Sequence, residues 1–186
     1  MSMGFVKRFK GIRLRVLFSN RVEDLISSEI DIAVRVVDEP PIDYVARKVA
    51  KMHWHLCASP KYLESLGKIR SPQQLEELDF LMPPPSKRTP LLTLERAGER
   101  QAVRITTKLE SESFPYLQEA AEQDAGIVLL PSYCAIQAVR EQKLQRVLPE
   151  FQVLQPMNNL YILTAPNPYP SVQQPRCGGI PGTPFG

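Results

Sequence analysis

Two kinds of hydrophobic periodicity alternate along the first part of the chain. Residues 12–18 alternate apolar with basic or polar side chains, which predicts a strand with one buried face. Residues 30–37 are apolar except for Asp31 and Arg35, and this run predicts a strand buried on both faces, as in a parallel sheet. A short helix is expected over 22–28. Strand, helix and strand at this spacing predict a right-handed crossover unit and the α/β class.

Helix-start and turn residues divide the rest of the chain. Ser59-Pro60 and Ser71-Pro72 each predict a helix start, because serine caps a helix and proline fits its first turn. The expected helices cover 60–66, 73–78, 111–123 and 132–140. Extended segments are expected within 45–58, 91–94, 102–109, 127–130 and 160–165. Residues 167–186 are rich in proline and glycine without apolar periodicity, which predicts a disordered tail.

Composition places the chain among ordinary globular proteins. Of its 186 residues, 43% are hydrophobic and 23% are charged, enough for one compact unit or two small lobes. A net charge of +3 excludes the strong positive field that drives sequence-independent binding to nucleic acid. Three widely spaced cysteines (Cys57, Cys134 and Cys177) predict reduced thiols in the cytosol. No apolar run approaches the ~20 residues of a membrane span, so no membrane partner is expected.

The sharpest hypothesis for chemistry is a zinc site. The chain has 2 histidines, His53 and His55, and on a strand they point to the same face as Cys57. Two imidazoles and a thiolate form a sound zinc set once a fourth ligand completes the tetrahedron. Against this, no carboxylate stands at a known spacing, and alternate polar positions are typical of the wetter face of a strand. Phosphate-binding glycine loops and serine nucleophile elbows are absent, so we expect no enzyme, no cofactor and no metal.

Three segments, in order, resemble the effector-binding region of LysR-type transcription regulators. The first is residues 21–26 leading into IDIAVR at 30–35. The second and most specific is LCASPKYL at 56–63, followed by Gly67 and Ser71-Pro72. The third runs from Ala120 to GIVLLP at 126–131. Residues 5–14 and 144–149 also resemble the family, which extends the likeness to about residue 165.

The resemblance implies an α/β, two-lobed, periplasmic-binding-protein-like (type 2) fold, truncated at the N-terminal strand and the C-terminal helix. The first lobe would comprise 1–58 plus 140–166 and the second 59–139, with 167–186 as the Pro/Gly tail. A small molecule would lie in the cleft between the lobes. One departure from the family is Asp124, which stands where a first glycine is usual.

The implied function is small-molecule effector binding and oligomerisation for a cytoplasmic transcription regulator. The expected partners are an anionic metabolite and either further copies of this chain or intact regulator subunits. DNA would be contacted only through a helix-turn-helix that this chain lacks. Two alternatives stay open: a truncated interaction fragment that pairs with intact subunits, and a metal-dependent enzyme using His53, His55 and Cys57.

The effector-binding residues expected from the implied fold lie after strands and at a helix start. They are Ser19, Asn20, Arg35, Ser111 and Ser113. Serine hydroxyls would bind polar groups of the effector, and the arginine would pair with an anion through two hydrogen bonds. The alternatives are helix capping for the serines and an ion pair between the lobes for Arg35.

Overall fold

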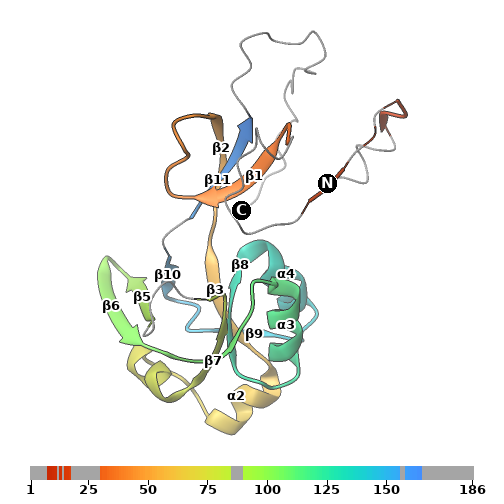
Figure 1. Cartoon of the computed structure of the whole chain (residues 1–186). Coiled ribbons are helices and arrows are strands. Elements are labelled where there is room, and N and C mark those ends of the chain that lie inside the picture. Colours follow the sequence, from red (N-terminus) through yellow and green to blue (C-terminus); the bar gives the residue numbers. More distant parts are fainter. Residues whose placement is uncertain are drawn as a thin grey trace. The chain divides into compact units, whose positions relative to one another are not determined.

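The computed structural model describes residues 8–11, 13, 15–17, 30–84, 90–155 and 158–164. Contacts divide the chain into two units (Figure 1): a larger one of Met1–Asp24 with His53–Leu154, and a smaller one of Leu25–Met52 with Gln155–Gly186. The chain therefore passes between units after Met52 and after Leu154, whereas the lobe boundaries predicted from the resemblance lie near 58 and 140. Those lobes stay a prediction. The predicted helix over 22–28 and the tail 167–186 lie outside the described residues, and the predicted strand over 12–18 is wrong where it is described, because residues 13 and 15–17 are exposed and in no strand.

The larger unit is built on one mixed sheet. Its strands are β3 (Trp54–Ala58), β4 (Asp79–Met82), β5 (Leu91–Arg96), β6 (Glu99–Arg104), β7 (Thr106–Glu110), β8 (Ile127–Pro131), β9 (Gln145–Val147) and β10 (Gln152–Leu154). Their order is β6-β5-β10-β3-β8-β4-β7, and β9 also pairs with β3. Strand β4 runs parallel to both β7 and β8, whereas β3 runs antiparallel to β8. The carboxyl ends of three parallel strands therefore meet at one edge of this sheet.

Helix α2 spans Pro60–Leu66, the 3-10 helix η1 spans Pro72–Glu77, and α3 and α4 span Phe114–Glu122 and Ser132–Arg140. Of these, α2, η1 and α4 begin within one residue of their predicted starts, whereas α3 begins three residues after the predicted start at 111. The Ser59 hydroxyl accepts a hydrogen bond from the Tyr62 amide at 3.0 Å, which caps α2. The Gln74 side chain accepts from the Ser71 amide at 3.1 Å, which closes the start of η1. These local hydrogen bonds satisfy amides that a helix start leaves open.

Both faces of the sheet are covered, and β8 contributes to both cores. Ile127 and Leu129 belong to one buried cluster, against which partly buried side chains of α2 pack. Val128 and Leu130 belong to the other, with buried residues of α3 and α4; Figure 1 shows these two helices side by side. Successive side chains of a strand point to opposite faces of the sheet, and both faces are covered here. All five residues of β8 are therefore buried, as the apolar run at 127–130 predicts.

The smaller unit holds a three-stranded antiparallel sheet. Strands β1 (Ala33–Val37), β11 (Asn159–Thr164) and β2 (Val45–Lys51) lie in the order β1-β11-β2. Ala33 and Leu163 form its buried centre, whereas Val34 is 54% exposed. The prediction of a strand buried on both faces at 30–37 is therefore wrong. Strand β1 pairs antiparallel with a strand from the far end of the chain, and of its five residues Ala33 alone is buried.

The turn between α3 and β8 is tightly packed. A Cβ atom on Gly126, whose φ is +155°, would lie 2.6 Å from the Asp79 carbonyl oxygen at the start of β4. Asp124 has a φ of 66°, and its carboxylate accepts hydrogen bonds from the Ser59 hydroxyl and the Lys61 ammonium, both at 2.6 Å. The aspartate that departs from the family pattern thus ties this turn to the start of α2.

Candidate functional site

One edge of the larger sheet gathers strand ends and helix starts; we call it the strand-end edge. Strands β4, β7 and β8 end there at Met82, Glu110 and Pro131, and α3 and α4 begin soon after β7 and β8. The Ser111 amide donates to the Met82 carbonyl at 3.3 Å, and the Ser132 amide donates to the His53 carbonyl at 2.8 Å. Ligands of open α/β sheets bind at such edges, where helix amides face outward.

An aromatic pair lies at the strand-end edge. The ring centroids of Trp54, the first residue of β3, and Phe114, the first residue of α3, are 5.8 Å apart at an interplanar angle of 59°. The Trp54 indole Nε1 is buried and has no hydrogen-bond partner among the described residues. A buried donor without an acceptor costs about 1–3 kcal/mol, so this N–H is a candidate for binding an acceptor that the described residues do not supply.

The two predicted serines come together at the start of α3. The Ser113 hydroxyl accepts from the Tyr116 amide at 3.4 Å and caps the helix. The Ser111 hydroxyl accepts from the Ser113 amide at 3.1 Å. Capping, the alternative given for these serines, is therefore present in the structure, and each hydroxyl keeps a hydrogen atom to donate elsewhere. That the serines also contact an effector stays a prediction.

The other predicted site residues are not joined to these serines. Arg35 is half-buried on β1 of the smaller unit, opposite Tyr161 of β11. Ser19 and Asn20 lie outside the described residues. The structure therefore brings together two of the five predicted residues and leaves the roles of the other three as predictions.

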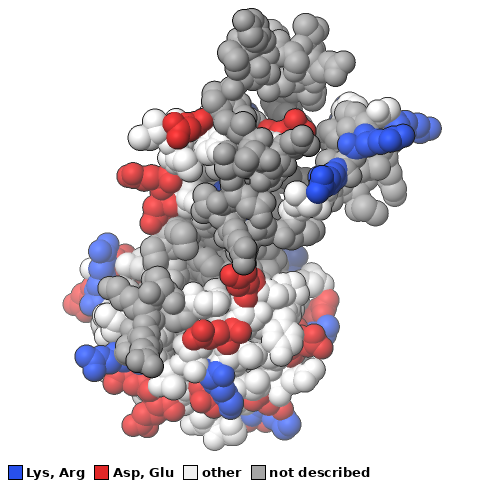
Figure 2. Space-filling model, in the orientation of Figure 1, with Lys and Arg blue, Asp and Glu red and all other residues white. Residues whose placement is uncertain are grey.

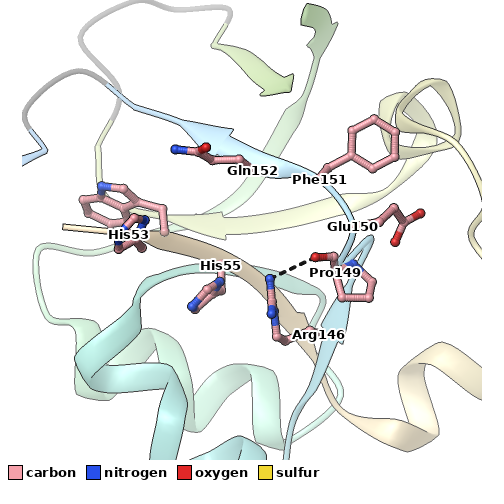
Figure 3. Close-up of a pocket in the computed structure, with 8 residues that line it drawn as sticks. His53, His55, Arg146, Pro149, Glu150, Phe151 and Gln152 are labelled. Carbon is pink, nitrogen blue, oxygen red and sulfur yellow. Dashed lines mark hydrogen bonds between the residues drawn. The ribbon is translucent and has the colours of Figure 1, made fainter. Parts of the chain in front are cut away.

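A second feature of the larger unit is a hollow of about 300 Å³ between β3 and the β9–β10 turn, which we call the β3–β9 hollow (Figure 3). It is lined by His53, Trp54, His55, Arg146, Pro149, Glu150, Phe151 and Gln152. An Arg146 guanidinium N–H donates to the Pro149 carbonyl at 3.2 Å. Burial, followed by the charges of Arg146 and His53, lowers the pKa of His55. Near neutral pH this imidazole is therefore uncharged, with one nitrogen donating and the other accepting.

The proposed zinc set does not come together. Cys57 is fully buried in the core beneath α3 and α4, and burial raises the pKa of its thiol to about 12. Zinc binds the thiolate, which is disfavoured here. No group of three or more histidine, cysteine or acidic side chains among the described residues is placed to hold a metal ion.

Sequence reasoning missed the parts played by Trp54 and Arg146. The Trp54 ring packs on the core, but its N–H has no hydrogen-bond partner among the described residues. Arg146 comes beside His55 because β9 pairs with β3, with Cys57 opposite Arg146. No periodicity in a three-residue strand signals that pairing.

The family follows from a comparison with protein-family models. The model described as "LysR substrate binding domain" matches residues 3–173. The chain belongs to this family. The LysR-type substrate-binding domain accounts for the ordered segments at 30–35, 56–63 and 126–131. None of the helices in the described part of the chain is long and apolar enough to cross a membrane.

Relatives and solved structures agree with this assignment. The chain is 31% identical, over 73% of its length and 44% of the relative, to an "HTH-type transcriptional activator TtdR" of Escherichia coli. It is 24% identical, over 93% of its length and 53% of the relative, to "HTH-type transcriptional regulator PtxR" of Pseudomonas aeruginosa. The chain thus spans about half the length of these curated relatives. Both are transcriptional regulators, and neither the metal-dependent enzyme nor the interaction fragment is favoured.

Solved regulatory domains confirm the fold. The full-length virulence activator AphB of Vibrio cholerae has a TM-score of 0.75 at 23% identity, covering 88% of this chain and 55% of that one. The CrgA regulatory domain of Neisseria meningitidis has a TM-score of 0.75 at 24% identity, covering 88% and 79%. The fold is therefore the periplasmic-binding-protein-like type 2 fold of LysR-type regulatory domains, as predicted.

Proposed function

We propose that this chain binds a small-molecule effector for a LysR-type transcription regulator, and that the strand-end edge forms part of the binding site. The observation that carries this proposal is the buried Trp54 N–H without a partner, next to the start of α3. A ligand oxygen at that position would accept from the indole. It would also lie near Ser111 and Ser113, whose hydroxyls keep hydrogen atoms to donate.

The effector in this proposal is an anion, such as a small carboxylic acid. The amides at the start of α3 and the positive end of its dipole favour negative charge. Arg35, Ser19 and Asn20 remain effector-binding residues expected from the family resemblance, and an arginine would supply the positive charge that a carboxylate pairs with most strongly. Aromatic side chains at Trp54 and Phe114 would pack against the carbon skeleton of the effector.

The proposed role is regulatory and not catalytic. The named relatives are transcriptional regulators, and the described residues hold no metal-binding cluster. In the proposed assembly the domain acts in the cytoplasm, pairs with copies of itself, and affects DNA through a helix-turn-helix domain of a longer regulator. On the face shown in Figure 2, acidic and basic side chains are interspersed over the larger unit. A surface that binds nucleic acid would instead carry a patch of basic side chains.

Two variants at Ser113 separate ligand binding from helix capping. Both asparagine and aspartate cap helices as well as serine does, but only aspartate adds a negative charge. Thermal unfolding of the full chain is measured against a panel of small organic acids. We expect one acid to raise the Tm of the wild type and of Ser113→Asn but not of Ser113→Asp, because the added carboxylate repels an anion. A panel without effect on the wild type, or equal stabilisation of both variants, would contradict the proposed site.

A further inference from the structure

The β3–β9 hollow has a charge pattern that the proposed effector site does not use. Both histidines of the chain line it, together with Arg146. Cys57 of β3 pairs with Arg146 of β9, so their side chains lie on the same face of the sheet. His55 precedes Cys57 by two residues on β3 and therefore also lies on that face, beside Arg146 (Figure 3). Three basic side chains from two segments about ninety residues apart in sequence therefore converge on one concavity.

The Arg146 guanidinium is oriented by the turn that follows it. One N–H donates to the Pro149 carbonyl at 3.2 Å, which holds the group over the hollow. A guanidinium has five N–H donors in a plane, so this bond leaves an edge with the geometry for a carboxylate or phosphate. The hollow of about 300 Å³ is at the lower end of the size range of small-ligand sites.

No ion pair with Arg146, His53 or His55 is present among the described residues. In Figure 3 the Glu150 carboxylate lies on the opposite side of Pro149 from the guanidinium, and no ion pair between Glu150 and Arg146 is present in the described part of the chain. Helix α4, which packs on β3, carries Tyr133 and Cys134, whose pKa values are both raised by burial, so both are neutral near pH 7. Glu150 also lines the hollow, but it forms no ion pair with Arg146, so the guanidinium is available to a ligand anion, and His55 adds a positive charge when it is protonated.

We propose that the β3–β9 hollow binds a small carboxylate- or phosphate-bearing anion through Arg146, His55 and His53. The site lies within the larger unit, and although Trp54 lines it, the proposed binding uses neither the Trp54 N–H nor Ser111 nor Ser113, so it can be tested independently of the proposed effector site. Binding is coupled to protonation. An anion favours the imidazolium form of His55, whose pKa is lowered in the free protein, so affinity rises as the pH falls from about 8 to 6.

The two histidines provide a direct readout. Their imidazole Cε1–H resonances are followed by proton NMR while the full chain is titrated with inorganic phosphate and, separately, with succinate. We expect saturable shifts of both resonances, tighter binding at the lower pH, and a higher His55 pKa in the presence of the anion. Comparing the two probes distinguishes a phosphate site from a carboxylate site.

A matched pair of variants tests the role of Arg146. Arg146→Gln removes one positive charge from the hollow and is expected to weaken binding about tenfold or more. Arg104→Gln removes the same charge from the exposed surface of β6 and is expected to change the affinity less than about twofold. Ser113→Asp should leave the phosphate titration unchanged, which separates this site from the effector site.

Two outcomes would overturn the inference. One is the absence of saturable histidine shifts with either probe at millimolar concentration. The other is an equal loss of affinity in Arg104→Gln and Arg146→Gln, because that result would show a general charge effect. Far-UV circular dichroism of each variant, compared with the wild type, establishes that the chain is folded during the titration, because Trp54 itself lines the hollow.

Discussion

The Gly126→Ala substitution tests the packing between the two central parallel strands. Gly126 directly precedes β8, and its added Cβ would lie 2.6 Å from the carbonyl oxygen and 3.2 Å from the carbonyl carbon of Asp79. These are backbone atoms at the start of β4, so no side-chain rotation relieves the overlap. The strands must separate where Phe80 pairs with Ile127, and both of those side chains are fully buried.

Two costs add at this position. Holding alanine at a φ of +155° costs about 1–3 kcal/mol of backbone strain. Forcing an extra carbon into a packed contact costs about a further 1–3 kcal/mol. We therefore expect Gly126→Ala to lower the free energy of unfolding by about 2–6 kcal/mol, a large part of the roughly 5–15 kcal/mol of a typical domain.

Gly67→Ala is the matched control. Gly67 ends α2 with a φ of +74°, but an added Cβ meets no atom within 4 Å, so only the backbone strain applies. Urea unfolding is followed by the fluorescence of Trp54, the single tryptophan of the chain, which packs against Phe114. Gly126→Ala should be less stable than Gly67→Ala by about 1–3 kcal/mol. Equal stabilities would refute the close contact between the start of β4 and the turn before β8.

Three further predictions concern local interactions. Ser113→Ala should lower the free energy of urea unfolding by about 1 kcal/mol through the lost cap of α3, whereas Ser113→Asn should restore it. Hydrogen bonds from Lys61 and Ser59 lower the pKa of the Asp124 carboxyl, so its charged form stabilises the fold above the ordinary pKa of 3.8. The stability difference between the wild type and Asp124→Asn should therefore be constant near neutral pH and shrink as the pH falls below 3.8, which urea titrations at several pH values would check. Cys57, whose pKa burial raises to about 12, should resist iodoacetamide in the folded protein at about pH 8 and react after unfolding, as read by peptide mass spectrometry; rapid labelling of the native chain would contradict its place in the core.

The elements with local signals were predictable from the sequence. Helix α2 carries its own cap at Ser59 and a proline at its start, and α3 and α4 show apolar positions at helical spacing. Strand β8 is a short apolar run followed by Pro131. Each of these signals acts within a few residues, so no knowledge of distant contacts was needed.

The elements without local signals were missed or misdivided. Strand β4 (Asp79–Met82) has four residues and lies directly after η1, and the sequence pattern assigned these residues to no element. The segment predicted as one strand over 102–109 is two strands, because β6 pairs with β5 whereas β7 pairs with β4. Pairing partners, and not propensity, decided where these strands begin and end.

The residues of the two candidate sites were likewise predictable where their signal is local and were missed where it is not. The sequence alone determined that Ser111 and Ser113 stand at a helix start, because capping is a local property of the backbone. It also determined the family, through motifs with defined order and spacing. Only the tertiary structure decided that Trp54 lies against Phe114 with its N–H buried and unpartnered, and that Arg146 lies beside His55. Both arrangements depend on pairing between segments far apart in sequence, and the free energy of such pairing belongs to the whole sheet rather than to any one stretch of the chain.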